Sequence, residues 1–419
     1  MRDTPYFTSD LIAAAPGILQ AFAIALEKDD MLSRRDILKA SAVSAAAAGM
    51  IGGMVKSAVA DDHRNIVPPS SYQPPADARG VYKYKFTDSK KRSLPSGWAR
   101  EATVEQFPIS EGVAGVDMTL EPGGVRELHW HAIAAEWAFM LEGRARITII
   151  DPEGKCEVAD FGPGDVWYFP KGYGHSIQAL AEGAHFILAF DNGHFSEFGT
   201  FSITDWVAHM PKEILEKIVN MPASIFSKAK QGEAYIVGGA VPPALPLAKN
   251  DGGLNNSPLT HRYQLMKQKP FFENDAGSVH LVSSKEFPIS TTMTGIIEIV
   301  KPGAVRELHW HPNANEWQYY ISGKGRMTVF SSHGHVQTEE YAPSDVGYVP
   351  QGFGHYIENL GDDDLKVLIV LDNGIYQDIS LSDWLAKTPA YLLADNFNNQ
   401  VEDWQARPKD KLVMSRRRK

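Results

Sequence analysis

Short runs in which hydrophobic and polar residues alternate fill most of the chain between residues 80 and 400, and Gly, Pro and Asp separate them. Helical periodicity is confined to segments near residues 204 and 212, after the last of these runs in the first half. Many short strands spaced about 8–12 residues apart are typical of a β-sandwich or small barrel. In the first half we expect strands at residues 113–120, 136–141, 145–150, 165–169 and 185–190.

The pattern occurs twice, at a constant offset of 180 residues. The heptapeptide VRELHWH stands at residues 125–131 and again at 305–311, and PGDVWYFPKGYGHSI from Pro163 corresponds to PSDVGYVPQGFGHYI from Pro343. Thr204-Asp205-Trp206 and Ser382-Asp383-Trp384 follow the last expected strands of the two halves. The repeat predicts an all-β protein with two tandem barrels of the same fold, each followed by short helices.

Composition shifts divide the chain further. We expect an N-terminal extension and export signal at 1–60, a first domain with its helices at 80–232, and a Gly-, Pro- and Asn-rich linker at 233–260. The second domain is expected at 261–400 and a tail at 401–419. The net charge of −10 argues against nucleic acid as a partner, and an anionic substrate would need local cations. With Cys156 as its one cysteine, the chain can form no intrachain disulfide.

The N-terminal extension carries Ser33-Arg34-Arg35, which resembles the twin-arginine export motif, and Ala58-Val59-Ala60 has the A-x-A pattern of a cleavage site. The Gly- and Ala-rich run between them is too short to span a bilayer comfortably. We therefore expect export by the twin-arginine route to the periplasm or outside the cell, without stable membrane insertion after cleavage. Met1 and Met31 both remain candidate start residues.

The candidate chemistry lies in four residues of each half. In a His-x-His strand both imidazoles point to one face, Glu follows after the next turn, and the last His arrives from the second repeated block. A single histidine of this kind would be a core residue, but the set recurs at identical spacing in both halves. The residue types suit Mn, Fe, Co, Ni or Zn and leave that choice open. The predicted ligands are His129, His131, Glu136 and His175, and His309, His311, Glu316 and His355.

These residues stand in a pattern that resembles the two cupin motifs. Gly123-x5-His129-x-His131-x4-Glu136-x6-Gly143 is followed by Gly164-x5-Pro170-x-Gly172-x2-His175. Duplicated in one chain, the motifs resemble bicupins, whose barrels are double-stranded β-helices or jelly rolls. Over about residues 80 to 400 the chain resembles bacterial oxalate decarboxylases. The motifs that carry this closer resemblance are RELHWH, EWA, DVWYFPKGYGHSIQAL and SITDWVAH.

The resemblance implies an oxalate decarboxylase, a carboxy-lyase with two Mn²⁺ per chain that converts oxalate to formate and CO2 with dioxygen as cocatalyst. It also implies that Arg126 and Arg306 bind the substrate, for which a guanidinium fork is suited. Strict alternation would place Arg126 opposite His129, so we expect a bulge or a strand start near Gly124. The alternative is an arginine at a barrel rim that makes a surface ion pair.

The first half has three more residues than the second between Asp-Asn-Gly and Asp-Trp, in the segment around Ser196-Glu197-Phe198-Gly199-Thr200. This insertion is either a lid or an indifferent surface loop. The resemblance makes Glu197 the proton donor of a lid, although Phe198-Gly199 departs from the usual family form. Ile369 stands where family members can carry a second glutamate. We therefore expect catalysis at the first site and a structural or electron-transfer role for the second.

Two other functions compete with the decarboxylase. An oxalate oxidase would release CO2 and hydrogen peroxide, and a non-catalytic exported bicupin would only bind manganese. Bicupins commonly assemble into rings, so a homo-oligomer, a trimer or a hexamer, is expected.

Overall fold

The computed structural model describes residues 81–196, 199–229, 231–245 and 255–416. The chain divides into two compact units, Met1–Tyr72 and Gln73–Lys419, and every described residue belongs to the second. Outside the described residues lie the expected export signal at 1–60, the lid residues Glu197 and Phe198, residues 246–254 of the expected linker and the last three residues of the tail. No helix in the described part is long and apolar enough to cross a membrane.

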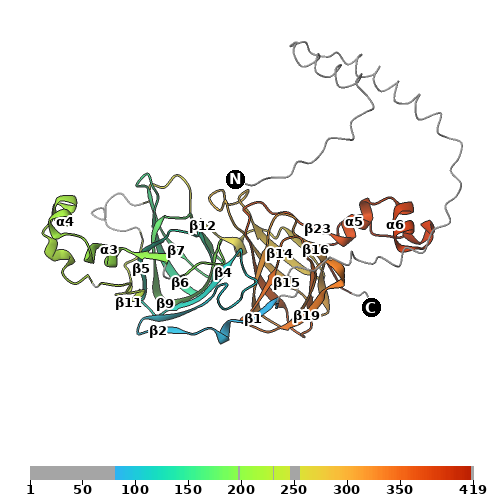
Figure 1. Cartoon of the computed structure of the whole chain (residues 1–419), viewed down its shortest axis with the longest axis horizontal. Helices are drawn as coiled ribbons and strands as arrows, with labels where there is room; N and C mark the ends of the chain where they lie inside the picture. The colour runs from blue at the N-terminus through green and yellow to red at the C-terminus, as the bar shows by residue number, and fades with distance from the viewer. Residues whose placement is uncertain (1–80, 197–198, 230, 246–254, 417–419) are drawn as a thin grey trace, which may run out of the picture. The chain divides into compact units, whose positions relative to one another are not determined.

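Two β-barrels form the described unit, and each is followed by a pair of helices (Figure 1). Every strand pairing is antiparallel, as expected for chains of hairpins with short turns. The first barrel consists of β2 (Arg92–Leu94), β3 (Gly97–Ala102), β4 (Ala114–Leu120), β5 (Val125–His131), β6 (Glu136–Ile150), β7 (Cys156–Phe161), β8 (Val166–Phe169), β9 (Gly174–Phe190), β10 (Thr200–Ser202) and β11 (Ile236–Val237). Its helices are α3 (Ile203–Ala208) and α4 (Lys212–Val219).

The second barrel repeats this order. Its strands are β13 (Phe272–Asn274), β14 (Gly277–Val282), β15 (Thr294–Val300), β16 (Ala304–Trp310), β17 (Glu316–Ser322), β18 (Gly325–Phe330), β19 (Val336–Tyr341), β20 (Asp345–Val349), β21 (Gly354–Asn359), β22 (Leu365–Leu371), β23 (Ile379–Ser380) and β24 (Met414–Arg416). Its helices are α5 (Leu381–Lys387) and α6 (Ala390–Phe397). The fold class predicted from the repeat, two tandem barrels with short helices after each, is confirmed.

Two short strands are exchanged between the barrels. β1 (Lys83–Lys85) precedes the first barrel but pairs with β20 of the second, and β12 (Arg262–Tyr263) precedes the second barrel but pairs with β8 of the first. The segment expected to be a tail also contributes to a sheet, because β24 pairs with β16. We propose that the expected domains at 80–232 and 261–400 correspond to the two barrels with these segments exchanged or added.

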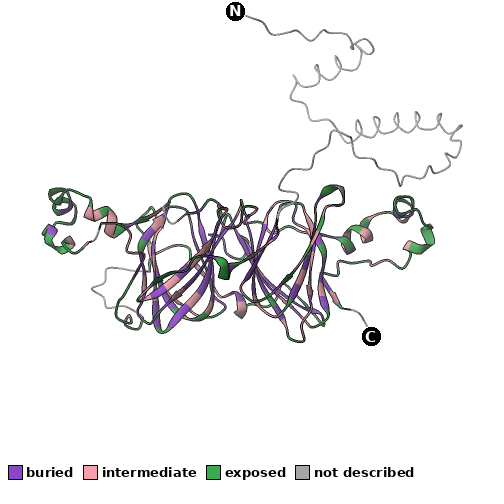
Figure 2. Cartoon of the chain, turned by 60° about the horizontal axis from the view of Figure 1, so that its bottom comes forward, coloured by how far each residue is buried: buried purple, intermediate pink, exposed green. Residues whose placement is uncertain are grey.

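Buried residues line both barrels (Figure 2). Each barrel holds one buried apolar cluster, and a third apolar cluster joins the two barrels. At the centre of the joining cluster, Trp137 packs on Gly295 and Trp317 packs on Gly115. A Cβ atom at either glycine would come within 2.3 Å of the opposing indole, so both positions require glycine for this approach. The two contacts are related by the 180-residue offset, so the joining cluster is itself symmetric.

Candidate metal centres

The four residues predicted from the first half meet inside the first barrel. His129 and His131 come from β5, Glu136 begins β6, and His175 lies on β9 directly opposite His129. All four are buried, and their donor atoms lie within 4.8 Å of one another. We call them the first metal cluster. Nitrogen and carboxylate donors at this separation can surround one divalent cation.

The second metal cluster consists of His309, His311, Glu316 and His355, and it has the same geometry. His309 lies opposite His355 on neighbouring strands, all four residues are buried, and their donor atoms again lie within 4.8 Å of one another. Both predicted ligand sets are thus brought together from separate strands. Their role as ligands remains a proposal.

The hydrogen bonds of the histidines leave Nε2 of each ring directed at its cluster. In the first cluster Nδ1 of His175 donates to the carbonyl of Tyr173 at 2.9 Å, and Nδ1 of His131 lies 3.0 Å from the Thr200 hydroxyl. In the second, Nδ1 of His309 donates to Glu307 O at 2.8 Å. A carbonyl on Nδ1 fixes the tautomer and leaves the Nε2 lone pair for a metal. His175 Nε2 is buried without a hydrogen bond among the described residues, as expected for a ligand atom.

The electrostatics also fit a divalent cation. Burial lowers the pKa of His131 to about 4 and lowers the pKa of His129 further below its ordinary value. Burial alone would raise the pKa of Glu136, but the nearby His131 and His175 rings, whose Nε2 atoms lie 3.1 and 3.4 Å from Glu136 Oε2, outweigh it and hold that pKa below its usual range. His129 and His131 are therefore neutral and Glu136 is ionised at neutral pH, which is the donor state that binds a metal. These residues fit a divalent metal ion.

Buried arginines accompany both clusters. The register of β5 against β9 shifts between Arg126 and His129, so both residues point inward despite their odd spacing. The same shift occurs between Arg306 and His309. The sequence predicted a bulge or a strand start near Gly124; β5 starts at Val125, and its register also shifts between Arg126 and His129. Arg126 and Arg306 are each at most 2% exposed, which is incompatible with the alternative of surface ion pairs at a barrel rim.

Each metal cluster is supported by different neighbours, which the motif search did not identify. Glu136 Oε1 accepts a hydrogen bond from the Trp167 indole at 2.8 Å, whereas Glu316 Oε1 accepts one from the Gln318 amide at 2.6 Å. At the offset of 180, Trp167 corresponds to Gly347, and a Cβ there would lie 2.5 Å from Gln318 Oε1. The second barrel thus replaces a large donor from β8 with a smaller one from β17. In the sequence this difference is visible as Trp167 aligned with Gly347, within two blocks that are otherwise similar.

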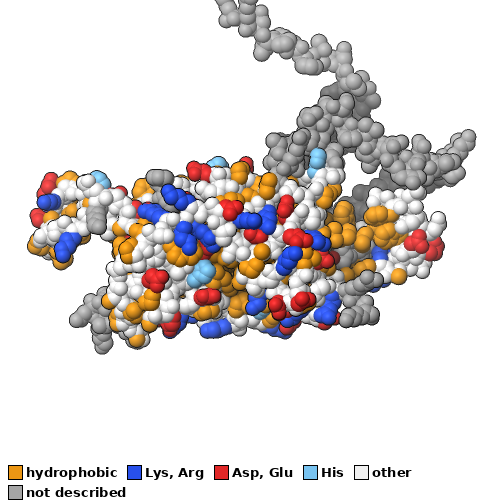
Figure 3. All heavy atoms as spheres, turned by 90° about the horizontal axis from the view of Figure 1, so that it is seen from below, with side chains coloured by type: hydrophobic (Ala, Val, Ile, Leu, Met, Phe, Trp, Pro, Cys, Tyr) orange, Lys and Arg blue, Asp and Glu red, His pale blue; other side chains and the backbone are white. Residues whose placement is uncertain are grey.

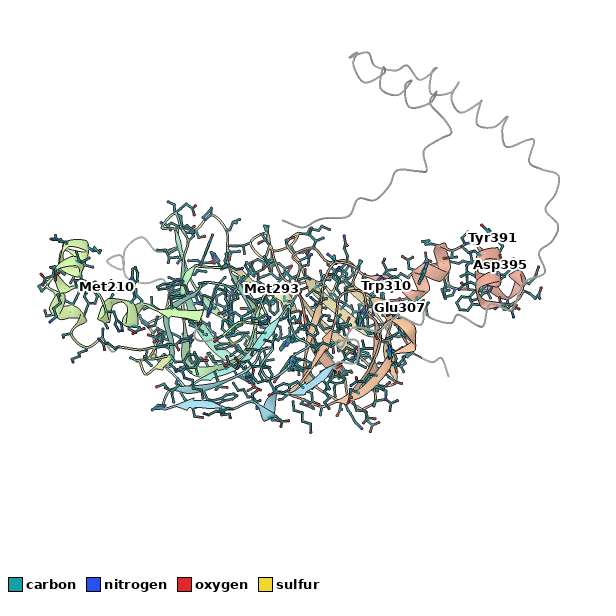
Figure 4. The ribbon with its side chains drawn as sticks, in the orientation of Figure 1. Met210, Met293, Glu307, Trp310, Tyr391 and Asp395 are labelled. Carbon is teal, nitrogen blue, oxygen red and sulfur yellow. The ribbon has the colours of Figure 1, made fainter. Side chains whose placement is uncertain are left out.

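A buried glutamate follows each arginine and anchors the strand that carries the two histidine ligands. The sequence motifs did not identify this glutamate in either half. Glu127 accepts from the Ser202 hydroxyl at 2.7 Å and from the Tyr235 backbone N–H at 2.7 Å, so it ties β5 to the start of α3 and to β11. Glu307 does the same in the second barrel through Ser382. Glu307 and Trp310 are labelled in Figure 4 on β16, beside α5. These anchors keep His-x-His in place on the strand.

Described residues on either side of Glu197 and Phe198 lie beside the first metal cluster. Phe195 stacks on Phe190 with ring centroids 3.6 Å apart and lies edge-on to the His131 ring at 5.3 Å. On the other side, Thr200 pairs with His131 in the β10–β5 ladder. Glu197 itself lies outside the described residues, so its role as proton donor stays a prediction.

A cupin family model matches residues 86–223 and 263–404, which are the two barrels. The "Oxalate decarboxylase OxdC" of Bacillus subtilis (strain 168) is 47% identical over 324 residues, which are 77% of this chain and 84% of that protein. The chain belongs to the bicupin oxalate decarboxylases. The resemblance drawn from the motifs is thereby confirmed. An oxalate decarboxylase of Arthroderma benhamiae is 34% identical over 355 residues, covering 78% of this chain and 83% of the relative.

Solved structures of the family agree. A structure described as oxalate decarboxylase from Bacillus subtilis at pH 4.6 superposes with a TM-score of 0.77 at 43% identity, covering 84% of this chain and 91% of that one. Another, from work on the Mn(II) centres of that enzyme, covers 87% and 98% with the same TM-score at 42% identity. Residues 31–50 match the signal sequence of the twin-arginine translocation pathway, so the expected export signal is confirmed.

Proposed function

We propose that the chain is a manganese-dependent oxalate decarboxylase, which converts oxalate and one proton to formate and CO2. The proposal is carried by two buried clusters of three histidines and one glutamate, each beside a buried arginine, in a chain 47% identical to an oxalate decarboxylase. Two Mn²⁺ ions per chain are its cofactors. When bound, manganese with dioxygen as cocatalyst supplies a Lewis acid and a one-electron couple for cleavage of the C–C bond.

Arg126 orients the substrate in this proposal. Its positive charge contributes to the low pKa values of His129 and His131, which indicates that the guanidinium lies close to the cluster. The ring of Tyr235 lies 4.2 Å from the guanidinium carbon, and the Tyr235 carbonyl accepts from Nη1 at 3.1 Å, so the side chain is held in one orientation. A fixed guanidinium can hold a carboxylate group beside the metal and offset its charge in an acidic protein.

Glu197 supplies the proton in this proposal. Loss of CO2 leaves a carbon centre that must be protonated to give formate, and a carboxyl group on a segment between Phe195 and Thr200 can reach the first cluster. Closure of that segment would also exclude water. The second barrel carries three fewer residues in the corresponding segment, which supports catalysis at the first site.

The deciding assay measures formate and hydrogen peroxide together after oxalate is added to manganese-loaded protein at mildly acidic pH. Formate without peroxide supports the decarboxylase. Peroxide without formate would make the chain an oxidase, an alternative that the Phe198-Gly199 departure of the lid keeps open. If neither product forms, the remaining alternative is a non-catalytic exported protein that binds manganese.

Replacement of Glu197 by Gln tests the proton donor. Because general acid catalysis contributes about 10²–10⁴-fold, formate production should fall by that factor while two manganese ions per chain are retained. Full formate production by this variant would refute the assignment. Metal content, measured by atomic absorption, is the control for the integrity of the sites.

We further propose that the exported protein is periplasmic or secreted and forms a homo-oligomer, a trimer or a hexamer. The helices that follow the barrels expose large apolar side chains, among them Trp206 at 56%, Trp384 at 59% and Ile218 at 73%. Such surfaces are typical of protein interfaces. Light scattering on the purified protein would test the assembly, and a monomer at micromolar concentration would contradict it.

On the face shown in Figure 3, Lys and Arg side chains are interspersed with Asp and Glu.

A further inference from the structure

A buried carboxylate in the second barrel has no counterpart in the first. Glu298 lies on β15, is 3% exposed, and corresponds at the offset of 180 to Met118 on β4, which is 1% exposed. Both residues belong to barrel interiors. A charge at such a position is costly unless it has a partner, so its presence needs an explanation.

The partner of Glu298 is the arginine beside the second metal cluster. Glu298 Oε1 accepts a hydrogen bond from Arg306 Nε at 3.0 Å, while Glu298 Oε2 is buried without a partner among the described residues. Charges on Glu316 and His355 also act on this carboxyl group, which indicates that it lies close to the cluster. Glu298 therefore joins the arginine to the interior of the second site.

A second carboxylate completes the surroundings of this arginine. Arg306 Nη2 donates to Asp378 at 2.9 Å, and Nη1 donates to the Val413 carbonyl at 3.2 Å. Asp378 corresponds to Thr200 of the first barrel, because β23 and β10 pair in the same way with the two His-x-His strands. Each of the three guanidinium nitrogens of Arg306 thus donates to an acceptor of the chain itself.

The first site is built differently. The carboxylate that pairs with Arg126 is Glu233, which lies 2.9 Å from Nη2 and is 18% exposed, whereas the side chains of Glu298 and Asp378 are 4% and 5% exposed. The interior position is occupied by the uncharged thioether of Met118. A carboxylate that enters the first site therefore does not meet a buried negative charge at this position, whereas one that enters the second does.

We propose that Glu298 acts as an internal carboxylate that occupies Arg306 and thereby excludes dicarboxylates from the second site. The residue is a specificity determinant: it confines oxalate to the first site of the same chain. The inference rests on the proposed function, because it presumes that oxalate binds beside the first cluster. Asp378, which also pairs with Lys411, is a second carboxylate on the same guanidinium, so a dianion would have to displace two carboxylates from Arg306 to bind there.

Oxalate binding stoichiometry tests the proposal without turnover. Calorimetric titration of the manganese-loaded full chain is carried out in the absence of dioxygen, near neutral pH, and manganese content is measured for every sample. The wild-type protein should bind one oxalate per chain. Glu298→Met, which gives the second barrel the residue of the first, should bind two.

Three further variants complete the design. Glu298→Gln keeps the size of the side chain and an acceptor for Arg306 but removes the charge, so it should also bind two oxalates and serves if the Met variant fails to fold. Glu298→Asp retains the charge and should stay at one. The reciprocal change Met118→Glu should reduce binding from one oxalate per chain to none, with two manganese ions retained.

The outcomes separate the inference from the function on which it rests. The inference would be overturned if the chain binds one oxalate both before and after removal of the Glu298 charge. It would also be overturned if the wild-type protein binds two. Retention of one oxalate by Met118→Glu would place the bound oxalate outside the first site and would also overturn it. No oxalate binding by the wild-type protein would overturn the proposed function itself.

Discussion

The two barrels hold nearly identical metal clusters in different surroundings. In the first, Trp167 donates to the ligand carboxylate and Met118 lies in the interior; in the second, Gln318 donates and Glu298 pairs with the arginine. The pKa of the second histidine in the His-x-His pair, His131 or His311, also differs between the barrels. Burial lowers it for both His131 and His311, but in the second barrel the Glu316 carboxylate outweighs burial and raises the pKa of His311. The same four ligand types therefore stand in different hydrogen-bonded and electrostatic surroundings in the two barrels.

The sharpest way to break the comparison is to remove one ligand from each cluster. A bound metal supplies several kcal/mol of transition-state stabilisation, so His175→Ala should lower formate production on the order of 10³-fold, which equals about 4 kcal/mol. His355→Ala should leave most of the activity, although each variant loses one of two manganese ions per chain. Equal loss of formate production in the two variants would show that both sites are needed for turnover.

Substitution of the two arginines should affect different properties of the protein, mainly catalysis for Arg126 and mainly stability for Arg306. Arg126→Met removes a charge-assisted contact to substrate worth about 1.5–3 kcal/mol, so kcat/KM should fall about 10- to 150-fold. Its loss in the free energy of unfolding should be smaller than that of Arg306→Met, because its partner Glu233 is 18% exposed. Arg306→Met leaves Glu298 buried without its partner, while Asp378 keeps its ion pair with Lys411, so the free energy of unfolding should fall by about 3–5 kcal/mol. Urea denaturation and steady-state kinetics on both variants would distinguish these effects. An exchange of the two phenotypes would contradict the assignment of the first site as catalytic.

At the contact between the barrels we expect symmetry instead. Gly115→Ala would place a Cβ 2.3 Å from the Trp317 ring, and Gly295→Ala would place one 1.9 Å from the Trp137 ring. Overpacking of this kind costs about 1–3 kcal/mol, so both variants should show a similar loss in the free energy of unfolding. Thermal melts of the two proteins would measure it. A large difference between them would mean that one barrel tolerates movement of its tryptophan better than the other.

The smallest expected effect is the pH dependence that Glu298 contributes, which Met118 at the matching position of the first barrel cannot show. Burial raises the pKa of Glu298 above its ordinary value near 4.5, although Arg306 opposes the shift. The folded protein then binds a proton that the unfolded chain has released, so this carboxyl group destabilises the fold as pH rises from 4.5 through the raised pKa. The stability difference between wild type and Glu298→Gln should change over that window. For Met118→Gln, the matched control, the difference should be independent of pH.

Local spacing predicted the ligands and the bulge, because strand alternation determines which side chains share a face. The role of Glu298 could not be predicted in this way, since it depends on how β15 is placed relative to β16 and on the loop that carries Asp378. The exchanged strands β1 and β12 were also beyond prediction, because two or three residues carry no measurable periodicity. Glu197 is the reverse case, a residue named from sequence that lies outside the described residues.

The exchange of β1 has a consequence for biosynthesis. The strand follows the export signal closely, yet the hydroxyl of Tyr341 reaches back 259 positions to the carbonyl of Tyr82, and β20 pairs with β1 only a few residues further on. A ribosome must therefore complete most of the second barrel before the segment next to the signal can be held in its native place. In a chain truncated before Tyr341, the segment that follows the twin-arginine signal would therefore lack these contacts with the second barrel.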